Sequence, residues 1–253
     1  MRVVKVVAII QARMTSTRLP GKVMKKILGK TLLELLLERV QLTSGIDEIV
    51  VASPFGKEHD DIEKAVQSFG NITFIRGDEH DVLARYHKAA LATKTDIVIR
   101  ITSDCPLYDY KIVSSWLELF KNSDISYLYA PHEKGYPLGL GAEILTFDAL
   151  NKAFQEAKDP YEREHVTPYI WRRPTMFPSI FIEYKPDLYH CRLAVDEEAD
   201  FQFVREIYER LYIQNPQFVF AEIKDLLSKE PELLKINQHI QQKPLIPLGA
   251  AYG

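Results

Sequence analysis

Residues 3–22 read VVKVVAIIQARMTSTRLPGK, an apolar run that passes directly into small, polar and basic residues. The first part, 3–10, predicts a β-strand because it is short, rich in β-branched residues and followed by polar Gln11. A secretory signal would end in a small-residue cleavage site, so we do not interpret this run as one. The sequence therefore predicts a buried first strand that opens into the segment 11–22.

The segment 11–22 has the composition of an anion-binding loop. Ligands bind outside the carboxyl ends of strands in open α/β sheets, and small residues let backbone N–H groups approach phosphate oxygens. Arg18 can make a forked contact with a phosphate, and Lys22 a point-charge contact. The segment is not a Walker A loop, because Gly21-Lys22 is followed by Val23 instead of Ser or Thr. A solvated loop with scattered cations is the alternative interpretation.

The distribution of charge supports a local anion site. The net charge is −3, yet residues 1–33 contain eight Lys or Arg and no Asp or Glu. A basic tail that binds nucleic acid would not lie between an apolar strand and an amphipathic helix. We therefore expect a phosphate-bearing small molecule as the ligand and no nucleic-acid partner.

Size and composition indicate an ordinary globular protein. The 253 residues are 46% hydrophobic and 26% charged, as is typical of such chains. No apolar run approaches the roughly 20 residues that span a bilayer, so we expect no membrane partner. The small number of cysteines favours a cytoplasmic location. Cys105 and Cys191 are too few for a disulfide framework or a zinc site, and we expect them to be small packing residues.

Predicted strands and helices alternate along the first half of the chain. Apolar patterns place strands over 3–10, 48–52, 72–75 and 96–102, and helices over 32–42, 59–69, 81–92 and 110–121. Such alternation implies right-handed crossovers. The expected fold class is α/β, with a mostly parallel, Rossmann-like sheet and helices on both faces.

The rhythm changes after residue 129. The Gly- and Pro-containing segment 131–141 predicts a loop. The pattern beyond it predicts strands over 141–146, 179–184 and 191–195, helices over 147–157, 161–171 and 201–211, and a polar helical tail over 221–242. We expect one α/β domain over 1–253, with a nucleotide-binding half, 1–129, and an acceptor-binding and dimerisation half, 130–253.

Asp104 is a candidate metal ligand, because it follows the apolar strand 96–102 and precedes Pro106. Magnesium prefers one or two carboxylates together with phosphate oxygens and water. Asp is also common in turns, which is the alternative interpretation.

Six segments together resemble the cytidylyltransferases that activate acidic sugars, such as the 3-deoxy-manno-octulosonate and acylneuraminate synthetases. They are 11–22, RGDEHDVLARY (76–86), TSDCPL (102–107), PLGLGAE (137–143), REHVTPY (163–169) and LAVD (193–196). The closest resemblance is to the spore-coat polysaccharide biosynthesis protein F family. Thr15 and Ser103 depart from this pattern, since the family often has Gly at both positions.

The resemblance implies the nucleotide-diphospho-sugar transferase fold, which is related to GT-A glycosyltransferases, and a homodimer. It implies CTP as one substrate, a small acidic sugar-like acceptor, and Mg²⁺ held by Asp104 and Asp196. Arg18 and Lys22 would be the catalytic residues on the phosphates. The implied nucleotide site consists of Gln11, Ala12, Arg13, Ser16, Arg18, Lys22, Arg76, Asp81 and Arg85, and the implied acceptor site of Pro106, Glu143 and His165.

Simpler roles compete at several of these positions. Asp81 could cap the helix that follows it, and Arg85 could pair with Asp81 or Asp78 one helical turn away. His165 could be structural, and Asp196 could cap the helix that begins near residue 197. Acidic groups of an acceptor could also be met by Arg163, Arg172, Arg173 and Lys134.

The expected reaction is transfer of CMP from CTP to the acceptor, with release of pyrophosphate. One alternative is a GT-A glycosyltransferase that uses a nucleotide-sugar donor. Such enzymes commonly carry Asp-x-Asp, whereas Ser103-Asp104-Cys105 has one carboxylate. The other alternative is a nucleotide-binding regulatory protein without turnover.

Overall fold

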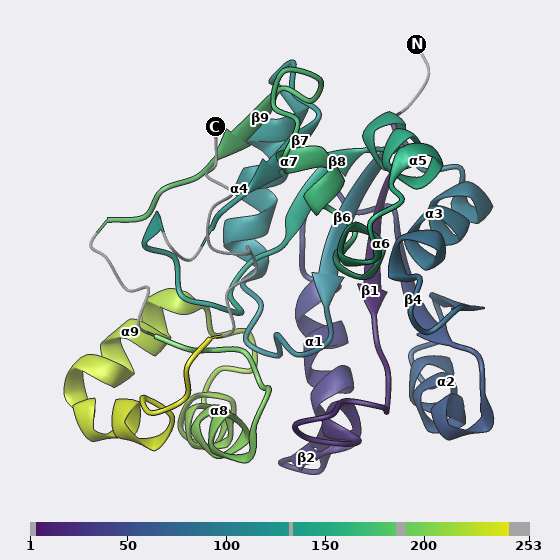
Figure 1. Ribbon diagram of the computed structural model, residues 1–253. Coiled ribbons are helices and arrows are strands. Elements are labelled where there is room, and N and C mark those ends of the chain that lie inside the picture. Colours follow the sequence, from purple (N-terminus) through teal and green to yellow (C-terminus); the bar gives the residue numbers. More distant parts are fainter. Residues whose placement is uncertain (1–3, 132–133, 186–190, 243–253) are drawn as a thin grey trace.

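The computed structural model describes residues 4–131, 134–185 and 191–242. Within these residues one sheet contains seven strands in the order β5-β4-β1-β6-β8-β7-β9 (Figure 1). Its strands are β1 (Val6–Gln11), β4 (Glu48–Pro54), β5 (Ile72–Gly77), β6 (Ile97–Thr102), β7 (Tyr127–Tyr129), β8 (Glu143–Thr146) and β9 (Ser179–Phe181). A small second sheet pairs β2 (Lys26–Ile27) with β3 (Lys30–Thr31).

Helices connect and cover the strands. The α-helices are α1 (Leu32–Val40), α2 (Asp60–Gln67), α3 (Val82–Thr93), α4 (Tyr110–Lys121), α5 (Phe147–Glu156), α6 (Pro160–His165), α7 (Pro168–Trp171), α8 (Glu198–Leu211) and α9 (Phe220–Lys229). Short 3₁₀ helices are η1 (Lys22–Met24), η2 (Lys57–His59) and η4 (Pro231–Ile236). No described helix combines the length and the apolar character that crossing a membrane requires.

The sheet is mostly parallel, as the sequence predicts. Strand β1 pairs in parallel with β4 and β6, and β4 pairs in parallel with β5. Strand β8 runs antiparallel to both β6 and β7. Because β1 and β6 run the same way with Gln11 opposite Thr102, their carboxyl ends meet at one edge of the sheet.

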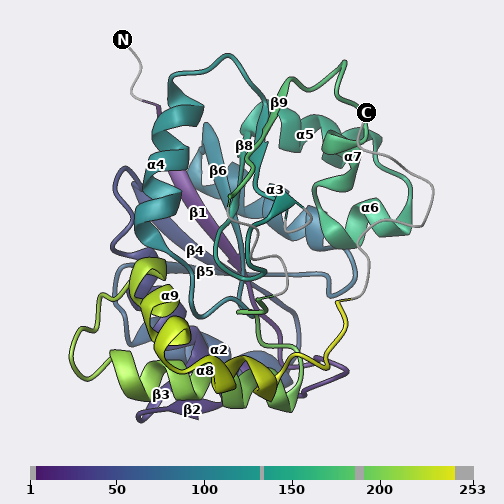
Figure 2. The same ribbon diagram turned by 90° about the vertical axis from the view of Figure 1, so that its left-hand side faces the viewer.

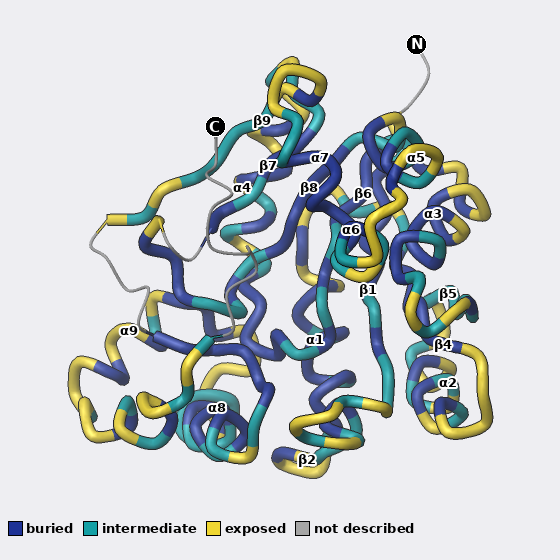
Figure 3. The backbone as a smooth tube through the Cα atoms, in the orientation of Figure 1, coloured by how far each residue is buried: buried dark blue, intermediate teal, exposed yellow. Residues whose placement is uncertain are grey.

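Both faces of the sheet are covered, which confirms the predicted arrangement. Alternate residues of a strand point to opposite faces. Ala8 and Ile10 of β1 belong to one core, with residues of α1, α4 and α8, whereas Val7 and Ile9 belong to another, with residues of α3 and α5. Figure 2 shows α4 and α3 on opposite sides of the strands, and Figure 3 shows that the central strand β1 is buried.

One strand was missed, and two predictions about the second half are wrong. Residues 127–129 form strand β7, which was not predicted because the run is short and aromatic. Residues 191–195 are not a strand of the sheet. They are tied to other loops, since Leu193 N donates to Leu138 O and Val195 N to Asp104 O. The predicted helix 161–171 is two helices, because Val166 has φ 72° and Pro168 begins α7.

The predicted polar, helical tail is also only partly correct. The chain forms α9 and then η4, which begins at Pro231. Phe220 and Ile223 of α9 are buried, so this segment packs onto the body of the protein. Figure 1 shows α9 beside α8, and the two helices are in contact.

Candidate active site

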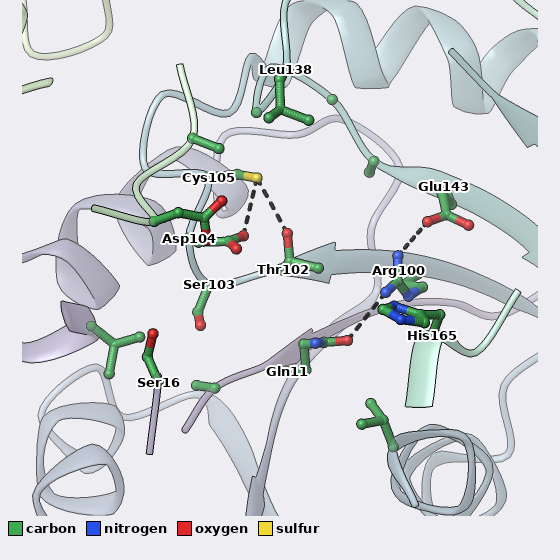
Figure 4. A pocket seen from close by; sticks show the side chains of 18 of the residues that line it. Gln11, Ser16, Arg100, Thr102, Ser103, Asp104, Cys105, Leu138, Glu143 and His165 are labelled. Atoms are coloured by element: carbon green, nitrogen blue, oxygen red, sulfur yellow. Dashed lines mark hydrogen bonds and ion pairs between the residues drawn. The ribbon is translucent and has the colours of Figure 1, made fainter. Parts of the chain in front are cut away.

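A cavity of about 360 Å³ lies where β1 and β6 end (Figure 4). This is within the range of roughly 300–1,000 Å³ that small-molecule sites occupy. Eleven of the residues that the sequence proposes line it: Gln11, Ala12, Arg13, Ser16, Arg18, Lys22, Arg85, Asp104, Glu143, His165 and Asp196. Segments that are far apart in the sequence therefore converge on one pocket.

The loop after β1 is closed on itself by backbone hydrogen bonds. Gly21 N donates to Met14 O at 2.8 Å, and Lys22 N donates to Leu19 O at 3.2 Å. Gly21 has φ 67°, a left-handed conformation that glycine adopts at little cost. The turn leads directly into η1, whose first residue is Lys22.

Lys22 joins two carboxylates at the mouth of the pocket. Its Nζ lies 3.3 Å from Asp104 Oδ2 and 2.9 Å from Asp196 Oδ1, and it donates to Val195 O at 2.7 Å. Lys22 is 8% exposed. The two carboxylates thus lie on either side of one buried cation.

These contacts shift the pKa values of Lys22 and Asp104. Burial alone would lower the pKa of Lys22, but the charges of Asp104 and Asp196 outweigh it and raise that pKa. Burial likewise opposes ionisation of Asp104. Attraction to Lys22 and hydrogen bonds from Thr102, Cys105 and Lys22 nevertheless lower the pKa of Asp104. At neutral pH the ammonium of Lys22 and the carboxylate of Asp104 are therefore both charged.

Asp196 contacts two further cations. Arg18 Nη2 lies 2.9 Å from Asp196 Oδ1, and Arg192 Nη2 lies 2.7 Å from Asp196 Oδ2. Asp196 is not the cap of the following helix. Glu197 is the N-cap residue of α8 and forms a capping box with Asp200. The side chain of Asp196 is therefore turned toward the pocket cations.

The pair Asp104 and Asp196 fits a divalent cation that arrives with phosphate. Magnesium is bound in proteins by one or two carboxylates plus substrate phosphates, and these two carboxylates already share one cation. Among the described residues, no group of three or more His, Cys, Asp or Glu side chains could hold a metal ion. A cation here would need ligand oxygens from a bound substrate.

The opposite side of the pocket contains a buried ion pair. Arg100 Nη1 in β6 donates to Glu143 Oε1 in β8, and Tyr127 OH donates to Glu143 Oε2 at 2.7 Å. Arg100 Nη2 also reaches Gln11 Oε1 at 3.4 Å (Figure 4). Burial would lower the pKa of Arg100, but the charge of Glu143 raises it. The side chain of Glu143 is thus held in place by Arg100 and Tyr127.

His165 lines the same region and is followed by an unusual turn. Thr167 N donates to His165 O at 2.9 Å across Val166, which has φ 72° and ψ −57°. This is a γ-turn, and it is strained for a β-branched residue. The ring of His165 lies against Tyr161, with centroids 4.3 Å apart. Burial lowers the pKa of His165, so its imidazole is neutral.

Three proposed site residues do not line the cavity. Arg76 pairs with Asp60 and Glu63 of α2. Asp81 caps α3 by accepting from Ala84 N, and it pairs with Arg163. Pro106 O accepts from Tyr208 OH. Their assignment to ligand binding stays a prediction.

Arg85 and the four candidate cations for an acidic acceptor also have protein partners. Arg85 Nη1 donates to the carbonyl oxygens of Asp78 and Glu79, so the predicted carboxylate pair is replaced by backbone contacts. The others pair with carboxylates: Arg163 with Asp81, Arg172 with Asp159 and Glu162, Arg173 with Glu162, and Lys134 with Glu183.

Sequence reasoning missed Arg100 and Arg192. Arg100 carries a signal that could have found it, because it interrupts the apolar run of a central strand. Arg192 carries none, since its contact with Asp196 depends on a non-helical turn. Cys105 and Cys191 are buried, as expected, although Cys105 Sγ also donates to Asp104 Oδ1 at 3.4 Å.

Comparison with protein families and curated proteins gives one consistent result. A family model described as Cytidylyltransferase matches residues 7–243. The spore coat polysaccharide biosynthesis protein SpsF of Bacillus subtilis is 31% identical over 88% of this chain and 94% of its own length.

Solved structures similar to this chain include a cytidylyltransferase. A cytidylyltransferase from Leptospira borgpetersenii is 29% identical, with a TM-score of 0.88 over 96% of this chain and all of the other. A CMP:2-keto-3-deoxy-manno-octonic acid synthetase complexed with CTP has the same fold. Its TM-score is 0.64 and its identity 21%, over 81% of this chain and 99% of the other.

Proposed function

Because this chain belongs to the cytidylyltransferase family, we propose that it transfers CMP from CTP to a sugar acid or related acceptor. Pyrophosphate is the second product. The name of the Bacillus subtilis relative supports a role in the synthesis of a surface polysaccharide or glycoconjugate. Turnover with CTP distinguishes this function from that of a nucleotide-binding regulatory protein.

The observation that carries the proposal is the cluster of Lys22, Arg18, Asp104 and Asp196 beside the loop after β1. Its two cations now neutralise the carboxylates. A triphosphate offers the same cations a larger negative charge at a partly buried site, where electrostatic contacts are stronger than in open water. The loop and the cluster are therefore suited to a nucleoside triphosphate with its metal ion.

The chemistry follows from this placement. An acceptor oxygen attacks the α-phosphorus of CTP, a new P–O bond forms, and the bond to the β-phosphate oxygen breaks to release pyrophosphate. Lys22 and Arg18 stabilise the charge that develops on the phosphoryl and leaving-group oxygens. Contacts of this kind are typically worth about 3–4 kcal/mol of activation free energy each.

Asp104 and Asp196 would hold the metal ion, which we propose is Mg²⁺. When bound, the ion supplies charge neutralisation and orientation of the triphosphate. The residues that hold it are themselves fixed by protein contacts, since Arg192 binds Asp196 and Cys105 binds Asp104.

The acceptor belongs on the side of the pocket that carries Glu143 and His165. Glu143 pairs with Arg100, and its carboxyl oxygens can accept hydrogen bonds from acceptor hydroxyl groups. Arg13 lines the pocket near these residues and is the cation we assign to an acidic group of the acceptor. Trp116 and Tyr136 line the wall at an edge-on angle of 85° and offer an apolar surface to a sugar ring.

The test is a screen of nucleoside triphosphates against candidate acceptors with magnesium, read out as pyrophosphate. We expect release with CTP together with a keto-sugar acid, a sugar phosphate or a phosphonate. A glycosyltransferase would instead release a nucleoside diphosphate from a nucleotide sugar. A regulatory protein would bind CTP and release nothing, and either result would overturn the proposal.

A further inference from the structure

His59, at the end of η2, is buried beside the loop after β1 and is assigned no role by the chemistry above. Its side chain is completely inaccessible to solvent. Its Nδ1 accepts a hydrogen bond from the backbone N–H of Met14 at 3.2 Å. Since Nδ1 accepts, the ring is neutral and its proton is on Nε2.

Met14 links His59 to the cluster of Lys22, Arg18, Asp104 and Asp196. The carbonyl of Met14 accepts a hydrogen bond from Gly21 N. Gly21 is followed by Lys22, which contacts the two carboxylates. Both backbone polar groups of Met14 are therefore fixed, one by His59 and one by the end of the loop. Loss of the His59 contact would release the start of a loop whose end carries Lys22.

We propose that neutral His59 is a positioning residue that holds the loop in the conformation that binds the triphosphate. The proposal rests on the proposed function for the identity of the ligand, and on the Met14 contact for the role of His59.

The surroundings of His59 give this contact a pH dependence. Burial lowers the pKa of His59. Glu58 and Glu79 act to raise it, and Arg76 and Arg85 act to lower it. The Oε1 atom of Glu58 lies 3.6 Å from His59 Nε2. A proton on Nδ1 would face the Met14 N–H, so the contact is present above the pKa of His59 and is lost as pH falls through it.

Two variants distinguish positioning from packing. Asn carries a carbonyl oxygen at the same distance from Cβ as Nδ1, so His59→Asn keeps the acceptor, whereas His59→Leu keeps the apolar bulk and removes the acceptor. We expect His59→Leu to raise KM for CTP about tenfold, as for the loss of one buried hydrogen bond, with a smaller change in kcat. His59→Asn should stay close to the wild type. The opposite order, with Leu better than Asn, would make His59 a packing residue and overturn the proposal.

The pH profile and hydrogen exchange complete the test. The wild type should show KM for CTP rising on the acid side, and this rise should be absent in His59→Asn. Exchange of the Met14 amide, followed by NMR without nucleotide, should be slow in the wild type and in His59→Asn and fast in His59→Leu. Because exchange needs no CTP, a wild type that does not bind CTP would refute the proposed function, while unchanged exchange in His59→Leu would refute the role of His59.

Discussion

Replacing Lys22 with Met should lower both stability and turnover, because it removes the cation that two carboxylates share. Met keeps the length and most of the apolar volume of the stem. The ammonium that contacts Asp104 at 3.3 Å and Asp196 at 2.9 Å disappears. Without it, two carboxylates face each other beside a buried stem.

The structure sets the size of the effect. Removing one partner of a buried pair costs about 3–5 kcal/mol. Here Asp196 keeps Arg18 and Arg192, and Asp104 keeps its hydrogen bond from Cys105, so we expect a smaller loss of about 2–3 kcal/mol. For a chain of this size that corresponds to a melting temperature lower by roughly 5–10 °C. Turnover should fall by about 10²–10³.

The loss of stability should also depend on pH. The lowered pKa of Asp104 means that the wild type gains stability from ionised Asp104 above the unfolded carboxyl pKa and loses it as pH falls through the folded value. Without Lys22, burial raises the pKa of Asp104, so Asp104 takes up a proton more readily. The difference between wild type and variant should therefore be largest near neutral pH and shrink as pH falls to and below the ordinary carboxyl pKa of about 3.9.

Thermal unfolding by circular dichroism and magnesium-dependent pyrophosphate release measure the two effects. Lys26→Met is the matched control, because Lys26 is exposed on β2 and lies outside the pocket lining. A Lys22→Met variant with the stability of the wild type and turnover within about twofold would show that Lys22 makes no phosphate contact.

Three further expectations follow. CTP with magnesium should raise the melting temperature more than ATP or GTP, since a ligand of the native state stabilises it by RT ln(1 + [L]/Kd); equal shifts would remove the cytidyl assignment. Asp196→Asn should lower turnover by about 10²–10³ but cost less than about 2 kcal/mol of stability, because Lys22 still pairs with Asp104 and Arg192 with Asp200. Melting curves and pyrophosphate release measure the two effects on this variant, and normal turnover would disprove the metal-ligand role. The resemblance to sugar-acid cytidylyltransferases leads us to expect a homodimer, which light scattering at micromolar concentration tests directly and a monomeric mass would exclude.

Aromatic residues are enriched at interfaces, and the sequence suggests Tyr127, Tyr129, Tyr136, Phe177 and Phe181 as aromatic surface for a dimer. Tyr127, Tyr136 and Phe177 are buried within the chain, and Tyr127 donates its hydroxyl to Glu143. Large aromatic residues occur in cores as readily as at interfaces, so residue type alone could not separate the two. Tyr129 and Phe181 are partly exposed, so the suggestion stays a prediction for these two residues.

The strands and helices of the first half could be predicted because their patterns are long and repeat. Strand β1 and helix α4 begin and end close to the predicted residues. The segment 191–195 shows where this fails: it is apolar and extended, but its hydrogen-bond partners are loops that are distant in sequence. Local pattern carries no information about such partners.

The candidate site, too, could be predicted only where local sequence determines it. The cations of the loop after β1 were evident from composition, and Asp104 from its position after β6. The joining of Asp104 to Asp196 by Lys22 depends on segments more than 80 residues apart. No spacing rule predicts that contact. The resemblance to a family pairs Asp104 with Asp196 as metal ligands and assigns Lys22 to phosphate, so it does not predict the contact either.

The reversed direction of β8 separates the connection that leads to Glu143 from the parallel strands that carry the loop after β1. Because β8 runs against β6, with Glu143 opposite Arg100 and Thr146 opposite Ile97, the chain before β8 is delivered to the ligand edge and the chain after it leaves at the far edge. A longer or shorter connection before Glu143 would remodel the acceptor wall and leave the strands that carry the nucleotide loop untouched. An engineer who wishes to change the acceptor should therefore graft residues 134–142 from a relative rather than alter β1 or β6.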